Sequence, residues 1–93
     1  MEQVIRLLVK GRVQGVGFRA FAESTARRLG VAGWARNLPT GDVEILARVT
    51  PENRQSFLDA IRHGPQLSRV DDVQTGPPLP GHECPVRGFS AVG

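Results

Sequence analysis

The chain of 93 residues contains one cysteine and no tyrosine. A single cysteine, Cys84, cannot form an internal disulfide, so we expect a reducing compartment, the cytoplasm. No apolar run approaches the roughly 20 residues that a membrane-spanning helix needs. The N-terminus also lacks the charged, apolar and small-residue order of a signal peptide. These absences predict a cytoplasmic protein with no membrane partner, and the length predicts a single domain, residues 1–93.

Histidine, cysteine and acidic residues do not occur at the spacings that metal sites use. His82 and Cys84 lie close together in a Pro- and Gly-rich segment, but two candidate ligands do not complete a zinc site. No Gly-Lys-Ser/Thr sequence follows the glycines near the N-terminus, which excludes a Walker loop. The chain is also too short for a Rossmann dinucleotide domain. We therefore expect no metal and no cofactor.

Positive charge is concentrated in the first third of the chain. Residues 1–36 contain seven basic and two acidic residues, whereas residues 37–93 contain five basic and seven acidic ones. A local excess of positive charge attracts small anions. The first third of the chain is therefore where we expect an anionic ligand.

The most informative segment is Gly-Arg-Val-Gln-Gly-Val-Gly-Phe-Arg at residues 11–19. It follows an alternating strand pattern at residues 4–10 and precedes a helical pattern. Gly11, Gly15 and Gly17 permit backbone conformations closed to other residues and let a ligand approach closely. The start of a helix also presents unpaired N–H groups and the positive end of the helix dipole. The segment thus predicts an anion-binding turn between a strand and a helix.

Arg19 strengthens this prediction, because a cation in the first turn of a helix opposes the helix dipole. An anion bound by both the backbone N–H groups and the forked guanidinium would remove the conflict, and phosphate fits that geometry. The alternative is an ion pair with Glu23 one helical turn later, in the weaker Arg-before-Glu order. Both explanations are compatible with the residues, and the charge distribution favours the anion.

The hydrophobic periodicity predicts the element order β-α-β-β-α-β with a trailing strand. The expected elements are a strand at 4–10, a helix at 18–29, strands at 31–38 and 42–49, a helix at 51–63, and strands at 69–75 and 86–92. Thr50 is the expected N-cap of the second helix, with Pro51 in its first position. This order is the ferredoxin-like split β-α-β arrangement, an α/β (α+β) sandwich whose mainly antiparallel sheet carries two helices on one face.

Two segments together resemble the acylphosphatases. They are residues 11–19 and the sequence Gly-Trp-Ala-Arg-Asn-Leu-Pro-Thr-Gly-Asp-Val-Glu at 33–44. They occur in the family's order and spacing, and the resemblance extends through about Val73 but is weak from Thr75 to Pro85. It implies hydrolysis of acyl phosphates, the mixed anhydrides of a carboxylic acid and phosphate, without metal or cofactor.

The resemblance also implies roles for individual residues. Backbone N–H groups would bind the phosphoryl oxygens, the Arg19 side chain would grip them, and Asn37 would orient the attacking water. The residues that would supply the N–H groups are Gln14, Gly15, Val16, Gly17, Phe18 and Arg19. By itself, Asn37 fits capping of the turn before Leu38 better, but its expected position on the strand beside the glycine turn favours the role in the site. The implied partners are a small-molecule acyl phosphate and inorganic phosphate, which is both product and inhibitor, and we expect a monomer.

Three alternatives remain at this point. A basic ferredoxin-like domain can bind RNA, can be a non-catalytic anion-binding module, or can act on a carbamoyl phosphate within a larger system. RNA-binding sheets stack bases on aromatic side chains of the open face. This chain has one Trp and four Phe, and Phe18, Phe21 and Phe57 are assigned to helices. We therefore expect no nucleic-acid partner.

Overall fold

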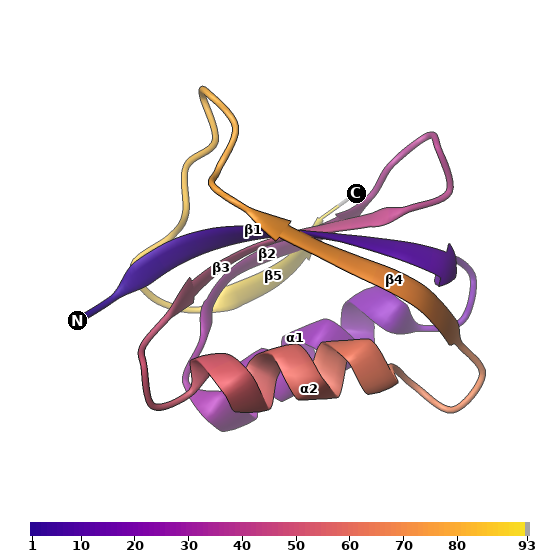
Figure 1. The fold of residues 1–93 in the computed structure, drawn as a ribbon, viewed down its shortest axis with the longest axis horizontal. Helices are drawn as coiled ribbons and strands as arrows, with labels where there is room; N and C mark the ends of the chain where they lie inside the picture. Colours follow the sequence, from indigo (N-terminus) through magenta and orange to yellow (C-terminus); the bar gives the residue numbers. More distant parts are fainter. Residues whose placement is uncertain (93) are drawn as a thin grey trace.

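The computed structural model describes residues 1–92 and has two layers, a five-stranded sheet and two helices that cover one of its faces (Figure 1). The elements are β1 (Gln3–Arg12), α1 (Phe18–Leu29), β2 (Ala32–Asn37), β3 (Val43–Val49), α2 (Arg54–His63), β4 (Arg69–Gly76) and β5 (Phe89–Val92). The strand order is β4-β1-β3-β2-β5, in which β2 and β5 are parallel and the other neighbours antiparallel. The predicted ferredoxin-like arrangement is confirmed, with the trailing strand added beside β2.

Two predicted boundaries differ from the structure by three residues, and the others by no more than two. Regular helix α2 begins at Arg54 and not at Pro51. The Thr50 N–H donates to Asn53 Oδ1 at 2.8 Å and the Asn53 N–H to Thr50 Oγ1 at 3.3 Å, as in a capping box. Thr50 thus caps a separate turn that precedes the helix. β5 begins at Phe89 rather than at residue 86, because its pairing with β2 starts only at Gly33 and Phe89.

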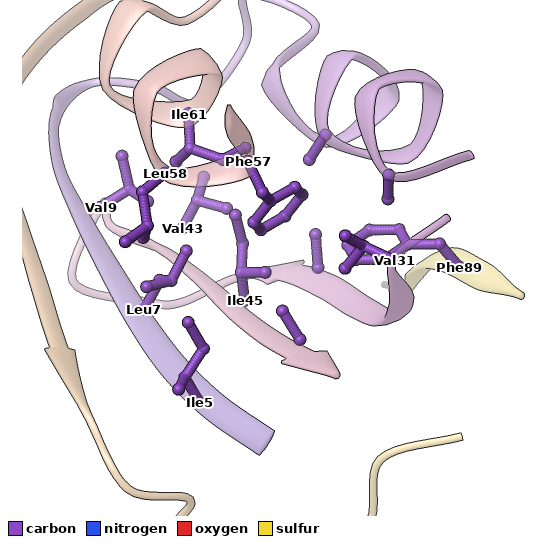
Figure 2. Packing of buried hydrophobic residues seen from close by; sticks show 14 of the residues in the cluster. Ile5, Leu7, Val9, Val31, Val43, Ile45, Phe57, Leu58, Ile61 and Phe89 are labelled. Carbon is purple, nitrogen blue, oxygen red and sulfur yellow. The ribbon is translucent and has the colours of Figure 1, made fainter. Parts of the chain in front are cut away.

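The core lies between the sheet and the helices. Alternate residues of the central strands face α1 and α2, and their side chains meet the helices' apolar stripes (Figure 2). The main contributors are Leu7, Val9, Val43, Ile45, Phe18, Ala22, Phe57, Leu58 and Ile61. Full burial of one large apolar side chain stabilises a fold by about 1.5–3 kcal/mol. Within residues 1–92, no helix is both long and apolar enough to cross a membrane.

The helix-free face of the sheet carries a buried carboxylate. Glu44 on β3 is only 1% exposed and accepts hydrogen bonds from Arg6 Nε at 2.6 Å and Arg36 Nε at 2.7 Å. Burial alone would raise the pKa of Glu44, but the hydrogen bonds and charges of the two arginines outweigh burial and lower it. The three side chains connect β1, β3 and β2 across this face.

This cluster predicts a pH-dependent contribution to stability. Because the folded pKa of Glu44 is lowered, its contribution is complete above the ordinary glutamate pKa of about 4.3. It is lost as the pH falls through the lower folded value. We expect Glu44→Gln to reduce the free energy of unfolding by about 1–2 kcal/mol at pH 7, since solvent partly screens both arginines. Urea unfolding of both proteins should show this difference shrinking below about pH 4.

The exposed Glu52→Gln variant is the matched control, and it should leave the pH dependence as in the wild type. A Glu44→Gln difference that stayed constant from pH 7 to pH 3 would contradict the assignment.

Candidate active site

The glycine turn, residues 14–19, leads from β1 into α1. The sign of the backbone φ angle alternates along it. Gly15 and Gly17 have φ angles of 75° and 77°, in the left-handed region, whereas Val16 between them has a negative φ. Such alternation turns successive N–H groups toward one side and forms an anion-binding concavity. A Cβ atom at either glycine would meet nothing within 4 Å. The backbone angle, and not a lack of space, therefore favours glycine at these positions.

The N-terminus of α1 lies in this turn. Gly17 is its N-cap and supplies no side-chain hydrogen bond, and the first helical turn contains no acidic residue. The first N–H groups of a helix have no partner within the helix, and they lie at the positive end of its dipole. The turn and the start of the helix thus offer neighbouring N–H donors without a carboxylate to compete for them.

A pocket of about 350 Å³ opens over this turn. Its lining residues come from the segment between β1 and the turn, from the turn itself, from the first residues of α1, and from the ends of β2 and β5. They are Val13, Gly15, Gly17, Phe18, Arg19, Ala20, Asn37 and Ala91. Among these residues Arg19 is the charged one, so the pocket is electropositive. Of the residues expected to supply N–H groups, Gln14 and Val16 are not among the lining residues, whereas the others and Asn37 are.

Arg19 is held by the far end of the chain. Its Nη1 donates to the Val92 carbonyl oxygen at 2.8 Å, at the end of β5. Glu23, the alternative partner, instead accepts from Arg27 Nη2 at 3.4 Å. The ion pair of Arg19 with Glu23 is therefore not formed, and Arg19 is one of the residues that line the pocket.

Asn37 is the last residue of β2 and pairs with Val43 across the hairpin. The loop after it is closed by backbone hydrogen bonds, from Leu38 N–H to Asp42 O at 2.9 Å and from Gly41 N–H to Leu38 O at 3.1 Å. Within residues 1–92, the Asn37 side chain makes no hydrogen bond to the protein. The hairpin thus closes without this side chain, which lies at the pocket.

Two contacts connect the hairpin to the first strand and the glycine turn, and neither was predicted. Gln14 Nε2 donates to the carbonyl oxygens of Leu38 and Asp42, both at 2.8 Å. Lys10 Nζ lies 3.0 Å from Asp42 Oδ2. The hydrogen bond from Lys10, with a smaller one from Thr40, lowers the pKa of Asp42 despite partial desolvation. Sequence spacing carries no signal for contacts between segments this far apart, so sequence reasoning missed them.

The comparison with protein families shows to which family the chain belongs. The family model described as Acylphosphatase matches residues 5–90. The chain belongs to the acylphosphatase family. It is accordingly a hydrolase of acyl phosphates, and the predicted family and activity are confirmed. The match also reaches further than residue 73 and includes the first two residues of β5.

Individual relatives agree with this assignment. The acylphosphatase of Thermus thermophilus is 48% identical over 82 residues, which cover 88% of this chain and 90% of the relative. The crystal structure of the Bacillus subtilis acylphosphatase superposes with a TM-score of 0.81 at 41% identity and covers 99% of both chains. An acylphosphatase from Coxiella burnetii gives a TM-score of 0.84 at 28% identity, over 98% of this chain and 93% of the relative.

Proposed function

We propose that the pocket over the glycine turn is the active site. In this proposal the N–H groups of residues 14–19 and the Arg19 guanidinium bind the phosphoryl group, and Asn37 orients the attacking water. The observation that supports it is the meeting, in one pocket, of a left-handed glycine turn, an arginine and an asparagine from separate elements.

The chemistry makes modest demands on these groups. Water attacks phosphorus, the bond from phosphorus to the acyl oxygen breaks, and the bond electrons leave with the carboxylate. A carboxylate with a pKa of about 4 needs no proton donor at neutral pH. The transition state of phosphoryl transfer is loose, so catalysis rests on positioning and charge stabilisation. N–H donors, one guanidinium and one amide supply both.

The roles follow from the side-chain chemistry. The Arg19 fork donates to two phosphoryl oxygens and neutralises negative charge. The Asn37 amide is not a base, but its oxygen can accept a hydrogen bond from water and direct a lone pair at phosphorus. The water's proton then passes to solvent or to the phosphate product.

Two alanines of the pocket lining support tolerance of different acyl groups. Ala20 and Ala91 are exposed members of the lining, and their side chains end at Cβ. They offer no charge or hydrogen bond with which to select one acyl group. We propose that the protein acts as a cytoplasmic monomer on varied acyl phosphates and that inorganic phosphate inhibits it competitively.

RNA binding on the helix-free face gains no support from the contacts there. Trp34 Nε1 donates to the Glu83 carbonyl oxygen at 3.1 Å, and the indole ring lies edge-on to His82 with centroids 5.3 Å apart. The Arg36 guanidinium lies 5.1 Å from the same indole centroid. The chain's single tryptophan is thus engaged by its own protein and does not offer a free stacking surface.

Metal independence is the first property to test. No lining residue is an Asp, Glu, His or Cys, the side chains that usually bind catalytic metals. We expect the protein to keep its full rate of phosphate release from acetyl or benzoyl phosphate after treatment with EDTA. The rate of spontaneous hydrolysis in the same buffer is the blank. Loss of activity in EDTA, restored by added Mg²⁺, would contradict the proposed mechanism.

A further inference from the structure

Gln14 joins the glycine turn to the hairpin that carries Asn37. Its two hydrogen bonds reach Leu38 and Asp42, the residues that begin and end the loop after the Asn37–Val43 pair. We propose that Gln14 is a positioning residue, whose side-chain amide fixes Asn37 relative to the phosphate-binding turn. This inference rests on the proposed role of Asn37 in directing water.

The bonds from Gln14 are additional to those that close the hairpin. The Leu38 oxygen already accepts from the Gly41 N–H, and the Asp42 oxygen from the Leu38 N–H. A carbonyl oxygen has two lone pairs and accepts a second bond readily. Loss of Gln14 therefore leaves no carbonyl without a partner and avoids the penalty for an unsatisfied buried group. We therefore expect the Gln14 amide to affect the position of the hairpin more than the free energy of unfolding.

Gln14 matters for placing the loop after Asn37 relative to β1, because the β1–β3 ladder does not reach that loop. The β1–β3 ladder ends at the pair Val9–Val43, and the remaining residues of β1, through Arg12, pair with β4 and not with the hairpin. The other link is the ion pair of Lys10 with Asp42. The lysine side chain is flexible and 40% exposed, so this ion pair restrains the orientation of the hairpin weakly. One planar amide bonded at two points holds both distance and orientation. Misplacement by about 1 Å can cost about 100-fold in rate.

The proposal is tested by Gln14→Met, which keeps the length of the side chain and removes both donors. With acetyl phosphate we expect kcat to fall about tenfold. The inhibition constant of inorganic phosphate should stay within about twofold, because the N–H groups and Arg19 are untouched. In an Asn37→Ala background, Gln14→Met should cause no further loss of kcat, because it acts through Asn37.

The matched control is Gln55→Met on α2, where within residues 1–92 the amide bonds only to Asp59, and it should leave kcat unchanged. If Gln14→Met does not fold, Gln14→Asn keeps an amide that is one carbon too short and should show the same pattern.

Unchanged kcat in Gln14→Met, an equal loss in both backgrounds, or a parallel loss of phosphate affinity would overturn the positioning role. If Asn37→Ala alone left kcat unchanged, the proposed function of Asn37 itself would fail, which is a separate result.

Discussion

Arg19→Ala should lower kcat/KM for acetyl phosphate by roughly 1,000-fold or more, the range seen for arginines that stabilise transferring phosphoryl groups. The pocket-lining residues include no other charged side chain, so nothing in the pocket replaces the lost guanidinium. Its anchor, the Val92 carbonyl, accepts one N–H, and a guanidinium has five N–H donors. Steady-state kinetics with acetyl phosphate should show the fall in kcat/KM. The inhibition constant of inorganic phosphate should rise.

Two further variants distinguish direct contact of Arg19 with the phosphoryl group from a general effect of positive charge. Arg12→Ala removes an exposed arginine at the end of β1 and should change kcat/KM by less than about threefold, through screened long-range attraction alone. Arg19→Lys keeps the charge but not the fork and should remain severely impaired. An Arg12→Ala loss as large as that of Arg19→Ala would mean that net charge, and not the pocket contact, matters.

Asn37→Ala should lower kcat by roughly 100- to 1,000-fold, as removal of one preorganised polar group does in other enzymes. Affinity for inorganic phosphate should change little, because the phosphate-binding groups lie on the glycine turn. The backbone pair of Asn37 with Val43 does not need the side chain, so we expect the hairpin to persist. Measuring kcat beside the phosphate inhibition constant separates the two effects.

Asn53→Ala is the control for loss of an asparagine. Asn53 precedes α2, and its side chain bonds to the Thr50 N–H and to the Leu29 carbonyl oxygen. Its replacement should cost about 1 kcal/mol of stability and leave kcat unchanged. If Asn37→Ala abolished phosphate binding instead, Asn37 would be a ligand or a structural residue and not a water-directing one.

The elements that sequence patterns predicted well depend on neighbouring residues. β3 places alternate residues in the core between sheet and helices as expected, and α1 begins at Phe18 and ends before Gly30, whose φ of 73° is left-handed. Strand and helix periodicity and the φ requirements of glycine act within a few residues, so they are readable in one dimension. The start of α2 was misplaced because Pro51 suits both a first helical position and a turn.

The chain alone thus determined the glycine turn, the order of elements, and the residue types from which an anion site can be built. Tertiary structure decided which side chains form hydrogen bonds and ion pairs with one another. Arg19 bonds to Val92 and not to nearby Glu23, Gln14 bonds to the hairpin, and Glu44 is buried between two arginines. These contacts exist because the strand order brings distant segments together at one end or face of the sheet. No local spacing encodes that order, since it results from packing the whole sheet against its helices.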